Sequence, residues 1–289
     1  MAIILITGAN GQLGNELKVV SKKFYGYEYI FTDIDTLDIT NPGKTEEFIK
    51  NSKPDWIVNC AAYNLVDKAE SDAEMVMLIN ATAVKNIADV IKGSECRFIH
   101  ISSNYIYDGK SNVPYNEYSV PDPISAYGRS KLAGEKFALQ HQGSMIIRTS
   151  WLYSTFGSNF VKTILRLAAE KDSINIVSDQ TGTPTYAADL AETIMNIISG
   201  VIRNQIALNA GIYNYSNEGT CTWYDFAVEI ISEAGLKCQV KPILTKDYPT
   251  AAKRPAYSVM DKSKIKDNYN ISIPHWRSSL TRCMKLLNK

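Results

Sequence analysis

The sequence predicts an α/β protein: a Rossmann-type doubly wound parallel sheet with a smaller C-terminal substrate-binding lobe. Apolar, β-rich runs alternate with segments of helical period over the first 150 residues, as in a parallel sheet covered by helices on both faces. A glycine-rich turn, "TGANGQLG", joins the first run to the first helical segment. Right-handed crossovers then place ligands beyond the carboxyl ends of the strands.

The predicted strands and helices follow one another in order along the chain. The strands are 2–7, 28–33, 55–60, 97–102 and 144–150, and the helices between them are 12–24, 43–52, 72–92 and 126–141. Later helices are expected at 158–171, 187–199, 222–234 and 278–288. The polar segments "SDQTGTPTY" and "DYPTAAKRPAYS" are typical of binding loops. We therefore expect a nucleotide-binding Rossmann domain in 1–150 and a mainly substrate-binding lobe in 151–289, with some later segments returning to the first domain.

Composition excludes several classes of protein. The 289 residues are 45% hydrophobic and 21% charged, with a net charge of +1 and no basic block, so neither nucleic acid nor an anionic membrane is expected as a partner. The start lacks the pattern of a signal peptide, and no apolar run is long enough to span a membrane. Five scattered cysteines without C-x-x-C suit reduced thiols in the cytoplasm. Three distant histidines offer little for a metal site or a Ser-His-Asp triad.

The glycine turn predicts a dinucleotide site. Gly8 permits a tight turn, Gly11 lets the backbone approach a pyrophosphate, and Gly14 lets the helix pack close to the sheet. The helix N-terminus then presents free amides and its positive dipole to the phosphates. A βα turn without a ligand is the alternative.

Other cofactor contacts are expected at the carboxyl ends of the next two strands. Asp33 can bind ribose hydroxyls, and Asp38 and Ile39 are placed to meet an adenine amine and its apolar face, although Asp38 alone equally suits a solvated turn. Ala61 and Ala62 would let a cofactor lie against the backbone, or simply pack. The full predicted cofactor set is Gly8, Asn10, Gly11, Gln12, Leu13, Gly14, Asp33, Asp38, Ile39, Ala61, Ala62, Tyr63, Tyr127 and Lys131.

Three residues of one βα unit form the predicted catalytic set. Tyr127 and Lys131 are one helical turn apart and share a face, and Ser103 ends the preceding strand. A free phenol has a pKa of about 10, which a neighbouring ammonium lowers. Tyr127 can then protonate a carbonyl oxygen as hydride arrives, Ser103 can bond the same oxygen, and Lys131 can hold the nicotinamide ribose. A tyrosine and lysine on a solvated surface is the alternative for the pair alone.

These residues, in this order, resemble the extended short-chain dehydrogenase/reductase superfamily. Within it, the chain is similar to the dTDP-4-dehydrorhamnose reductase family nearly end to end, in segments that include "YGRSKLAGE", "IIRTSWLY", "SDQTGTPT" and "YPTAAKRPAYS". That resemblance implies reduction of the 4-keto group of dTDP-4-dehydro-L-rhamnose by NAD(P)H, giving dTDP-L-rhamnose for cell-surface polysaccharides. It implies Tyr127 as proton donor, Lys131 as its partner and Ser103 as the third catalytic hydroxyl.

The resemblance also implies a sugar pocket. Trp151 would lie against the deoxysugar, although a core tryptophan is the alternative, and Arg254 would pair with the diphosphate or lie as a surface charge. The predicted substrate-binding set is Asn64, Val66, Ser103, Asn104, Tyr105, Trp151 and Arg254. Ser103 and Asn104 stand where the family usually has threonine and aspartate, and "YNLVD" replaces a T-A-V-D pattern.

Partners and alternatives complete the expectations. Some family members dimerise through Mg²⁺ held by acidic side chains; Glu16 matches one such position but Ala188 occupies another, so we predict no metal and either a monomer or a homodimer. Asp33 favours NADH, since its carboxylate repels a 2′-phosphate and "FTDIDTLDIT" contains no lysine or arginine to offset that repulsion. Lys44 or a residue distant in the sequence is the alternative source of a positive charge. The resemblance implies use of both cofactors. A reductase of another nucleotide-linked 4-keto-6-deoxysugar, or an NADP-binding regulatory subunit of the methionine adenosyltransferase type, stays open.

Overall fold

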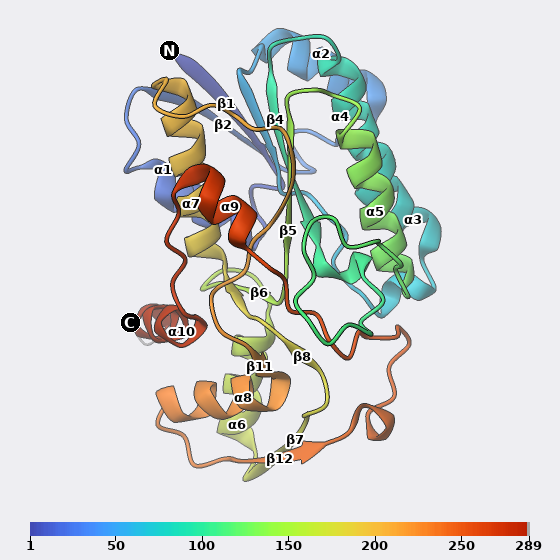
Figure 1. Ribbon diagram of the computed structural model, residues 1–289, viewed down its shortest axis with the longest axis vertical. Helices are drawn as coiled ribbons and strands as arrows, with labels where there is room; N and C mark the ends of the chain where they lie inside the picture. The colour runs from blue at the N-terminus through green and yellow to red at the C-terminus, as the bar shows by residue number, and fades with distance from the viewer. Residues whose placement is uncertain (288–289) are drawn as a thin grey trace.

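A computed structural model of the protein describes residues 1–287 (Figure 1). Its central feature is a six-stranded sheet in the order β10-β5-β4-β3-β1-β2, with every neighbouring pair parallel. The chain places β2 on one side of β1 and then β3, β4 and β5 on the other side. The sheet therefore has a topological switch point between β1 and β3. The strands are β1 (Ala2–Thr7), β2 (Tyr27–Thr32), β3 (Trp56–Asn59), β4 (Arg97–Ser103), β5 (Ser144–Thr149) and β10 (Gly211–Asn214).

Helices cover both faces of this sheet because its strands are apolar on both sides. Ile4 and Ile6 of β1 belong to the core under α1 (Gln12–Ser21), α7 (Ala187–Ile202) and α9 (Ser263–Tyr269). Leu5, between them, faces the opposite core under α2 (Pro42–Ser52), α4 (Ala83–Ile91) and α5 (Ala126–Ala138). The predicted doubly wound α/β fold is confirmed.

The crossover from β3 to β4 departs from the single helix expected at 72–92. It consists of η1 (Lys68–Glu70), α3 (Ala73–Met77), the π-helical turn η2 (Leu78–Thr82) and α4. Asn80, within η2, accepts a hydrogen bond from the Tyr63 backbone N–H at 2.8 Å and donates to the Tyr63 carbonyl at 3.1 Å. A Cβ on Gly134 of α5 would lie 2.2 Å from the Asn80 carbonyl. The π turn therefore fastens the segment after β3 to the helix that carries Tyr127 and Lys131.

The remaining elements form a smaller lobe with its own core around Tyr153, Phe226 and Trp276. It contains α6 (Phe160–Glu170), α8 (Trp223–Glu233) and α10 (Trp276–Leu287), and the parallel pair β7 (Ser173–Val177) and β12 (Gln239–Ile243). Short segments complete it: β6 (Leu152–Tyr153), β8 (Thr181–Gly182), β9 (Thr185–Tyr186), β11 (Cys221–Thr222) and η4 (Thr245–Asp247). The predicted helix 278–288 corresponds to α10, and its last residue lies outside the described residues.

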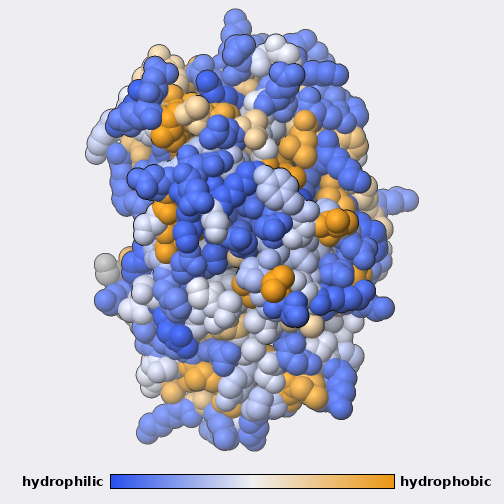
Figure 2. Space-filling view, viewed as in Figure 1, coloured by the Kyte–Doolittle hydropathy of each residue, from blue (hydrophilic) through white to orange (hydrophobic). Residues whose placement is uncertain are grey.

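Figure 1 shows the lobe below the sheet, beyond the carboxyl ends of its strands. The later elements α7, β10 and α9 return to the sheet, so residues after 150 contribute to both parts. On the face in Figure 2, hydrophilic residues predominate and apolar ones form small separate groups. Within residues 1–287 no helix has the length and apolar character needed to cross a membrane.

Candidate active site

A cavity of about 440 Å³ opens at the carboxyl ends of β1, β3, β4 and β5, where the sheet meets the lobe. Residues far apart in the sequence converge on it, as the doubly wound topology requires. Its lining includes the predicted residues Gly8, Gly11, Gln12, Leu13, Gly14, Ala62, Asn64, Val66, Ser103, Asn104, Tyr105, Tyr127, Lys131 and Trp151. Asn10, Asp33, Asp38, Ile39, Ala61, Tyr63 and Arg254 do not line it.

The glycine turn has the geometry that the motif predicts. Gly8 has φ +66°, and a Cβ there would lie 2.4 Å from the Ala61 nitrogen, so the turn after β1 touches the backbone after β3. A Cβ on Gly14 would lie 2.4 Å from the Gly8 carbonyl oxygen. Gly11 caps α1 without a side-chain hydrogen bond to the helix, which leaves the first amides of α1 free to bind an anion.

Asp33 lies at the end of β2, next to this turn. Its carboxylate accepts hydrogen bonds from the backbone N–H groups of Asn10 at 2.8 Å and Ile34 at 2.9 Å. These bonds fix the carboxylate, and its remaining lone pairs can accept from ribose hydroxyls.

The expected contacts of Asp38 and Ile39 with adenine stay a prediction. Ile39 is 6% exposed and packs in the core with Leu37 and Ile49, so little of its side chain is left to form an apolar face for adenine. Asp38 holds its own turn by accepting from the Thr40 backbone N–H and hydroxyl. Apolar periodicity alone does not reveal that Ile39, after the half-buried Asp38, turns inward.

Ala61 and Tyr63, in the segment after β3, are each held by a hydrogen bond to a side chain. The Ala61 N–H donates to Asn59 Oδ1 at 3.1 Å, and the Tyr63 hydroxyl donates to Asp72 Oδ2 at 3.1 Å. The Ala61 backbone therefore packs directly against Gly8. The Tyr63 side chain points toward the start of α3 and does not line the cavity.

Ser103, Tyr127 and Lys131 converge as predicted. Tyr127 is 8% exposed, and its hydroxyl lies 3.5 Å from Asn64 Oδ1, while its ring meets Tyr105 edge to face. Lys131 Nζ donates to the Ile101 carbonyl of β4 at 2.7 Å. Ser125 caps α5 by accepting from the Gly128 N–H, which fixes the first turn, where Tyr127 lies.

The acidity of this set differs from the expectation. Burial raises the pKa of Tyr127 to about 12, with the Ser103 hydroxyl offsetting part of the rise. Burial also lowers the pKa of Lys131 to about 8. In the protein without ligand, burial thus moves the pKa of Tyr127 in the direction opposite to the one expected from a neighbouring lysine, because desolvation disfavours the phenolate.

Trp151 forms one wall of the cavity. It follows β5 with φ +45°, an uncommon conformation for a bulky residue. Its ring stacks on Trp223 with centroids 3.6 Å apart and planes 13° apart. A Cβ on Gly182 would lie 2.6 Å from the Trp151 ring, so a glycine is needed behind it. The Trp151 side chain is therefore held in place by its neighbours but is only partly buried.

Asn64, Val66, Asn104 and Tyr105 border the same space. Asn104 is 1% exposed, and its side-chain Nδ2 has no hydrogen-bond partner among the described residues. A buried amide donor at a cavity wall is costly unless a ligand or water accepts from it.

Arg254 does not line this cavity. Its guanidinium pairs with Asp67 at 2.6 Å and donates to the Tyr105 hydroxyl at 2.9 Å, and it lines a neighbouring cavity with Trp223 and Tyr248. The guanidinium is engaged within the protein, so contact with a diphosphate stays a prediction.

Two features were not predicted. Residues 157–159 line the cavity, and Asn159 Nδ2 donates to Gln12 Oε1 at 3.0 Å, so the lobe reaches the glycine turn. Behind the site, Arg148 of β5 makes a buried bidentate pair with Glu135 of α5, at 2.9 and 2.7 Å. The arginine and glutamate of "IIRTS" and "LAGEK" have the charges for such a pair, but the sequence alone does not show that both are buried.

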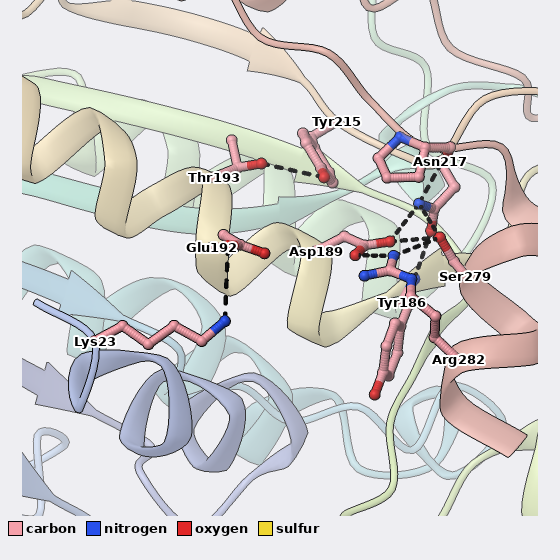
Figure 3. A network of polar contacts seen from close by, with 10 residues as sticks. Lys23, Tyr186, Asp189, Glu192, Thr193, Tyr215, Asn217, Ser279 and Arg282 are labelled. Atoms are coloured by element: carbon pink, nitrogen blue, oxygen red, sulfur yellow. Dashed lines mark hydrogen bonds and ion pairs between the residues drawn. The ribbon is translucent and has the colours of Figure 1, made fainter. Parts of the chain in front are cut away.

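The acidic residues near Glu16 do not fit a metal site. Burial, and then the charge of Asp189, raise the pKa of Glu16, which accepts from the Ser154 hydroxyl at 2.6 Å. Asp189 itself is paired with Arg282 and accepts from Asn217 and Ser279 (Figure 3). Ala188 packs against the core of the lobe. No group of three or more His, Cys, Asp or Glu residues in 1–287 is placed to hold a metal.

Known proteins resemble the chain over its whole length. The RmlD substrate binding domain family matches residues 1–289. A dTDP-4-dehydrorhamnose reductase from Aggregatibacter actinomycetemcomitans is 38% identical, over 97% of each chain. The spore coat polysaccharide biosynthesis protein SpsK of Bacillus subtilis is also 38% identical, over 97% of this chain and 96% of its own.

Solved structures agree. A dTDP-4-dehydrorhamnose reductase from Clostridium acetobutylicum superposes with a TM-score of 0.92 at 38% identity, covering 99% of this chain and 100% of its own. A Bacillus anthracis dTDP-4-dehydrorhamnose reductase in complex with NADP gives a TM-score of 0.91 at 37% identity, with the same coverage. With a whole-length family match and relatives above one-third identity that share its fold, this chain belongs to the dTDP-4-dehydrorhamnose reductase family of the short-chain dehydrogenase/reductase superfamily.

Proposed function

We propose that this protein reduces the 4-keto group of dTDP-4-dehydro-L-rhamnose to the alcohol of dTDP-L-rhamnose, with NADPH or NADH as reductant. The observation that carries the proposal is the convergence of Ser103, Tyr127 and Lys131 on the cavity that the glycine turn also lines. A free helix N-terminus, a fixed carboxylate at Asp33 and small residues at the turn suit a dinucleotide. Reduction of a ketone by a nicotinamide cofactor, the activity of the family, requires such a dinucleotide site next to a proton donor.

The bound reduced nicotinamide supplies a hydride to the carbonyl carbon. Tyr127 gives its phenolic proton to the carbonyl oxygen, so the C=O becomes CH–OH and the phenolate is left on the protein. Ser103 donates a hydrogen bond to the same oxygen and thereby stabilises its developing charge. Because Lys131 uses one donor on the Ile101 carbonyl, its others remain for the ribose hydroxyls, and its charge stabilises the phenolate.

Among the residues that line the cavity, Trp151 and Asn104 have surroundings that best suit contact with the substrate. The stacked tryptophan offers a flat apolar surface to the methyl-bearing ring. The unpartnered Asn104 amide supplies a donor for a sugar oxygen.

The location and assembly are part of the proposal. All five cysteines are free and the net charge is +1, which supports a cytoplasmic enzyme that binds no nucleic acid. We infer a monomer or a homodimer without a bridging metal.

The test is incubation of the purified protein with NADPH and dTDP-4-dehydro-L-rhamnose, following NADPH absorbance and identifying the product by NMR. Equimolar NADPH loss and dTDP-L-rhamnose formation are expected. Cofactor binding without any turnover would point to a non-catalytic NADP-binding subunit, and turnover only with another 4-keto-6-deoxysugar nucleotide would correct the substrate.

A further inference from the structure

A lysine from α1 lies beside the predicted ribose site. Lys18 Nζ donates to Asn10 Oδ1 at 2.9 Å, and the backbone N–H of Asn10 donates to Asp33 Oδ2 at 2.8 Å. The same ammonium lies 5.8 Å from the ring centroid of Phe31, at the end of β2. Lys18 therefore contacts the glycine turn, whose backbone in turn binds the Asp33 carboxylate.

The charge of Lys18 is available to a ligand. Among the ion pairs formed within residues 1–287, none includes Lys18, whereas nearby Lys23 pairs with Glu192. The side-chain oxygen of Asn10 is neutral, so this contact orients the ammonium without neutralising it. Lys18 is also half-buried, which limits the solvent screening of its charge.

Asp33 alone would discriminate against NADPH. If the ribose hydroxyls bind this carboxylate, a 2′-phosphate lies next to it and is repelled by the like charge. A nearby arginine or lysine is the usual remedy in dinucleotide-binding folds. Lys44, the first basic residue after Asp33 in the sequence, lines a different cavity from the glycine turn, together with Glu47 and Phe48.

We propose that Lys18 binds the 2′-phosphate of NADPH, and that the pair Lys18 and Asp33 lets the enzyme use both cofactors. Lys18 supplies the cation for the phosphate, Asp33 accepts from the hydroxyls of NADH, and Asn10 holds the two at a fixed separation. This inference rests on the proposed function, since it assumes that the adenosine ribose lies at Asp33.

Binding of cofactor fragments tests the inference apart from catalysis. Calorimetric titration with 2′,5′-ADP and with 5′-AMP is performed on the wild type, Lys18→Gln and Lys18→Arg. Lys18→Gln should weaken binding of 2′,5′-ADP by about ten- to hundredfold, the factor of a charge-assisted hydrogen bond. It should leave the affinity for 5′-AMP within about twofold, because that fragment has no 2′-phosphate and keeps only a longer-range, salt-screened attraction to Lys18. Lys18→Arg should restore most of the affinity for 2′,5′-ADP. Lys22→Gln, one turn further along and exposed, is the matched control and should change neither ligand.

Kinetics give the second readout. Lys18→Gln should lower the ratio of kcat/KM for NADPH to that for NADH, and Asp33→Ala should raise it. Two results in a Lys18→Gln protein with wild-type melting temperature would overturn the role of Lys18 and leave the proposed function standing. One is an equal loss of affinity for 2′,5′-ADP and 5′-AMP, and the other is an unchanged ratio of kcat/KM for NADPH to that for NADH. Failure of the wild-type protein to bind either fragment or either cofactor overturns the cofactor site itself, and the inference with it.

Discussion

Tyr127 is a neutral phenol throughout the neutral pH range, because burial raises its pKa to about 12. A proton donor must carry its proton before the reaction, so this shift favours the reductive direction. Lys131 behaves in the opposite sense: burial lowers its pKa to about 8, and its charge is lost as the pH rises through that value. The lysine, not the tyrosine, is therefore the group whose titration limits activity on the alkaline side.

This predicts a one-sided pH profile for reduction. We expect kcat/KM for the keto sugar to be level from neutral pH to about 8 and then to fall by up to about tenfold per pH unit as one essential proton is lost. Steady-state rates at saturating NADPH, in buffers of constant ionic strength, measure this. A rate that stays constant to pH 10 would show that the charge of Lys131 is not needed.

Tyr127→Phe removes the proton donor and keeps the ring. Turnover should fall by at least about a hundredfold, as for loss of a general acid, while NADPH affinity, measured by fluorescence titration, stays near that of the wild type. Wild-type turnover in this variant would rule out Tyr127 as the donor.

Trp151→Ala separates a substrate contact from a packing role. Loss of the aromatic surface should weaken kcat/KM for the sugar nucleotide by about 1–3 kcal/mol while NADPH affinity holds. Trp223→Ala is the matched control, since it removes the same stack but does not line the cavity. Similar melting temperatures with the kinetic loss confined to Trp151→Ala are expected. Equal kinetic loss in both variants would instead assign Trp151 a structural role.

At the scale of elements, α5 is the part that positions the catalysis. Tyr127, Lys131 and Glu135 follow one another at intervals of one turn on one face of this helix. Glu135 is 1% exposed and binds Arg148 of β5 in the same buried network as Ser102 of β4. The helix is thus fixed to the two strands whose carboxyl ends border the cavity.

Glu135→Gln should therefore destabilise the fold strongly. It leaves the buried charge of Arg148 without a counter-charge, at a cost of about 3–5 kcal/mol. Glu46→Gln, which breaks the exposed pair with Lys50, should cost no more than about 0.5 kcal/mol. Urea unfolding of both variants measures the difference, and equal midpoints would contradict a structural role for the buried pair.

The elements also show what the sequence can and cannot predict. The five strands before residue 150 and the other helices between them were predicted to within a few residues, because apolar strands and amphipathic helices have clear periods. The single helix expected at 72–92 is instead divided into α3, η2 and α4. The partners β7 and β12 were missed, since their paired residues, such as Ser173 and Gln239, lie far apart in the sequence in short, partly exposed runs. Two-residue strands such as β6 and β9 have no period to detect.

Site residues divide in the same way. Local motifs located Gly8, Ser103, Tyr127 and Lys131, whose geometry is set within single βα units. The partner of Arg254, the inward turn of Ile39 and the loop at 157–159 depend on contacts between distant segments.

At the scale of the whole molecule, the cavity exists because the lobe closes over the carboxyl ends of the sheet. Asn159 of the lobe binds Gln12 of the glycine turn, and Ser154 binds Glu16 of α1. Near Glu16, Arg282 and Ser279 of α10 bind Asp189 of α7 (Figure 3). The lobe is therefore fastened to the sheet domain through the glycine turn, α1 and α7.

The central claim is that hydride passes to C4 of the sugar while Tyr127 supplies the proton. The most direct test uses NADPH deuterated at the transferred position of its nicotinamide, with dTDP-4-dehydro-L-rhamnose as substrate and NMR of the sugar product. We predict dTDP-L-rhamnose with one deuterium at C4, formed by the wild type and almost abolished in Tyr127→Phe. Product without deuterium at C4, or no product from a protein that binds both ligands, would contradict the claim.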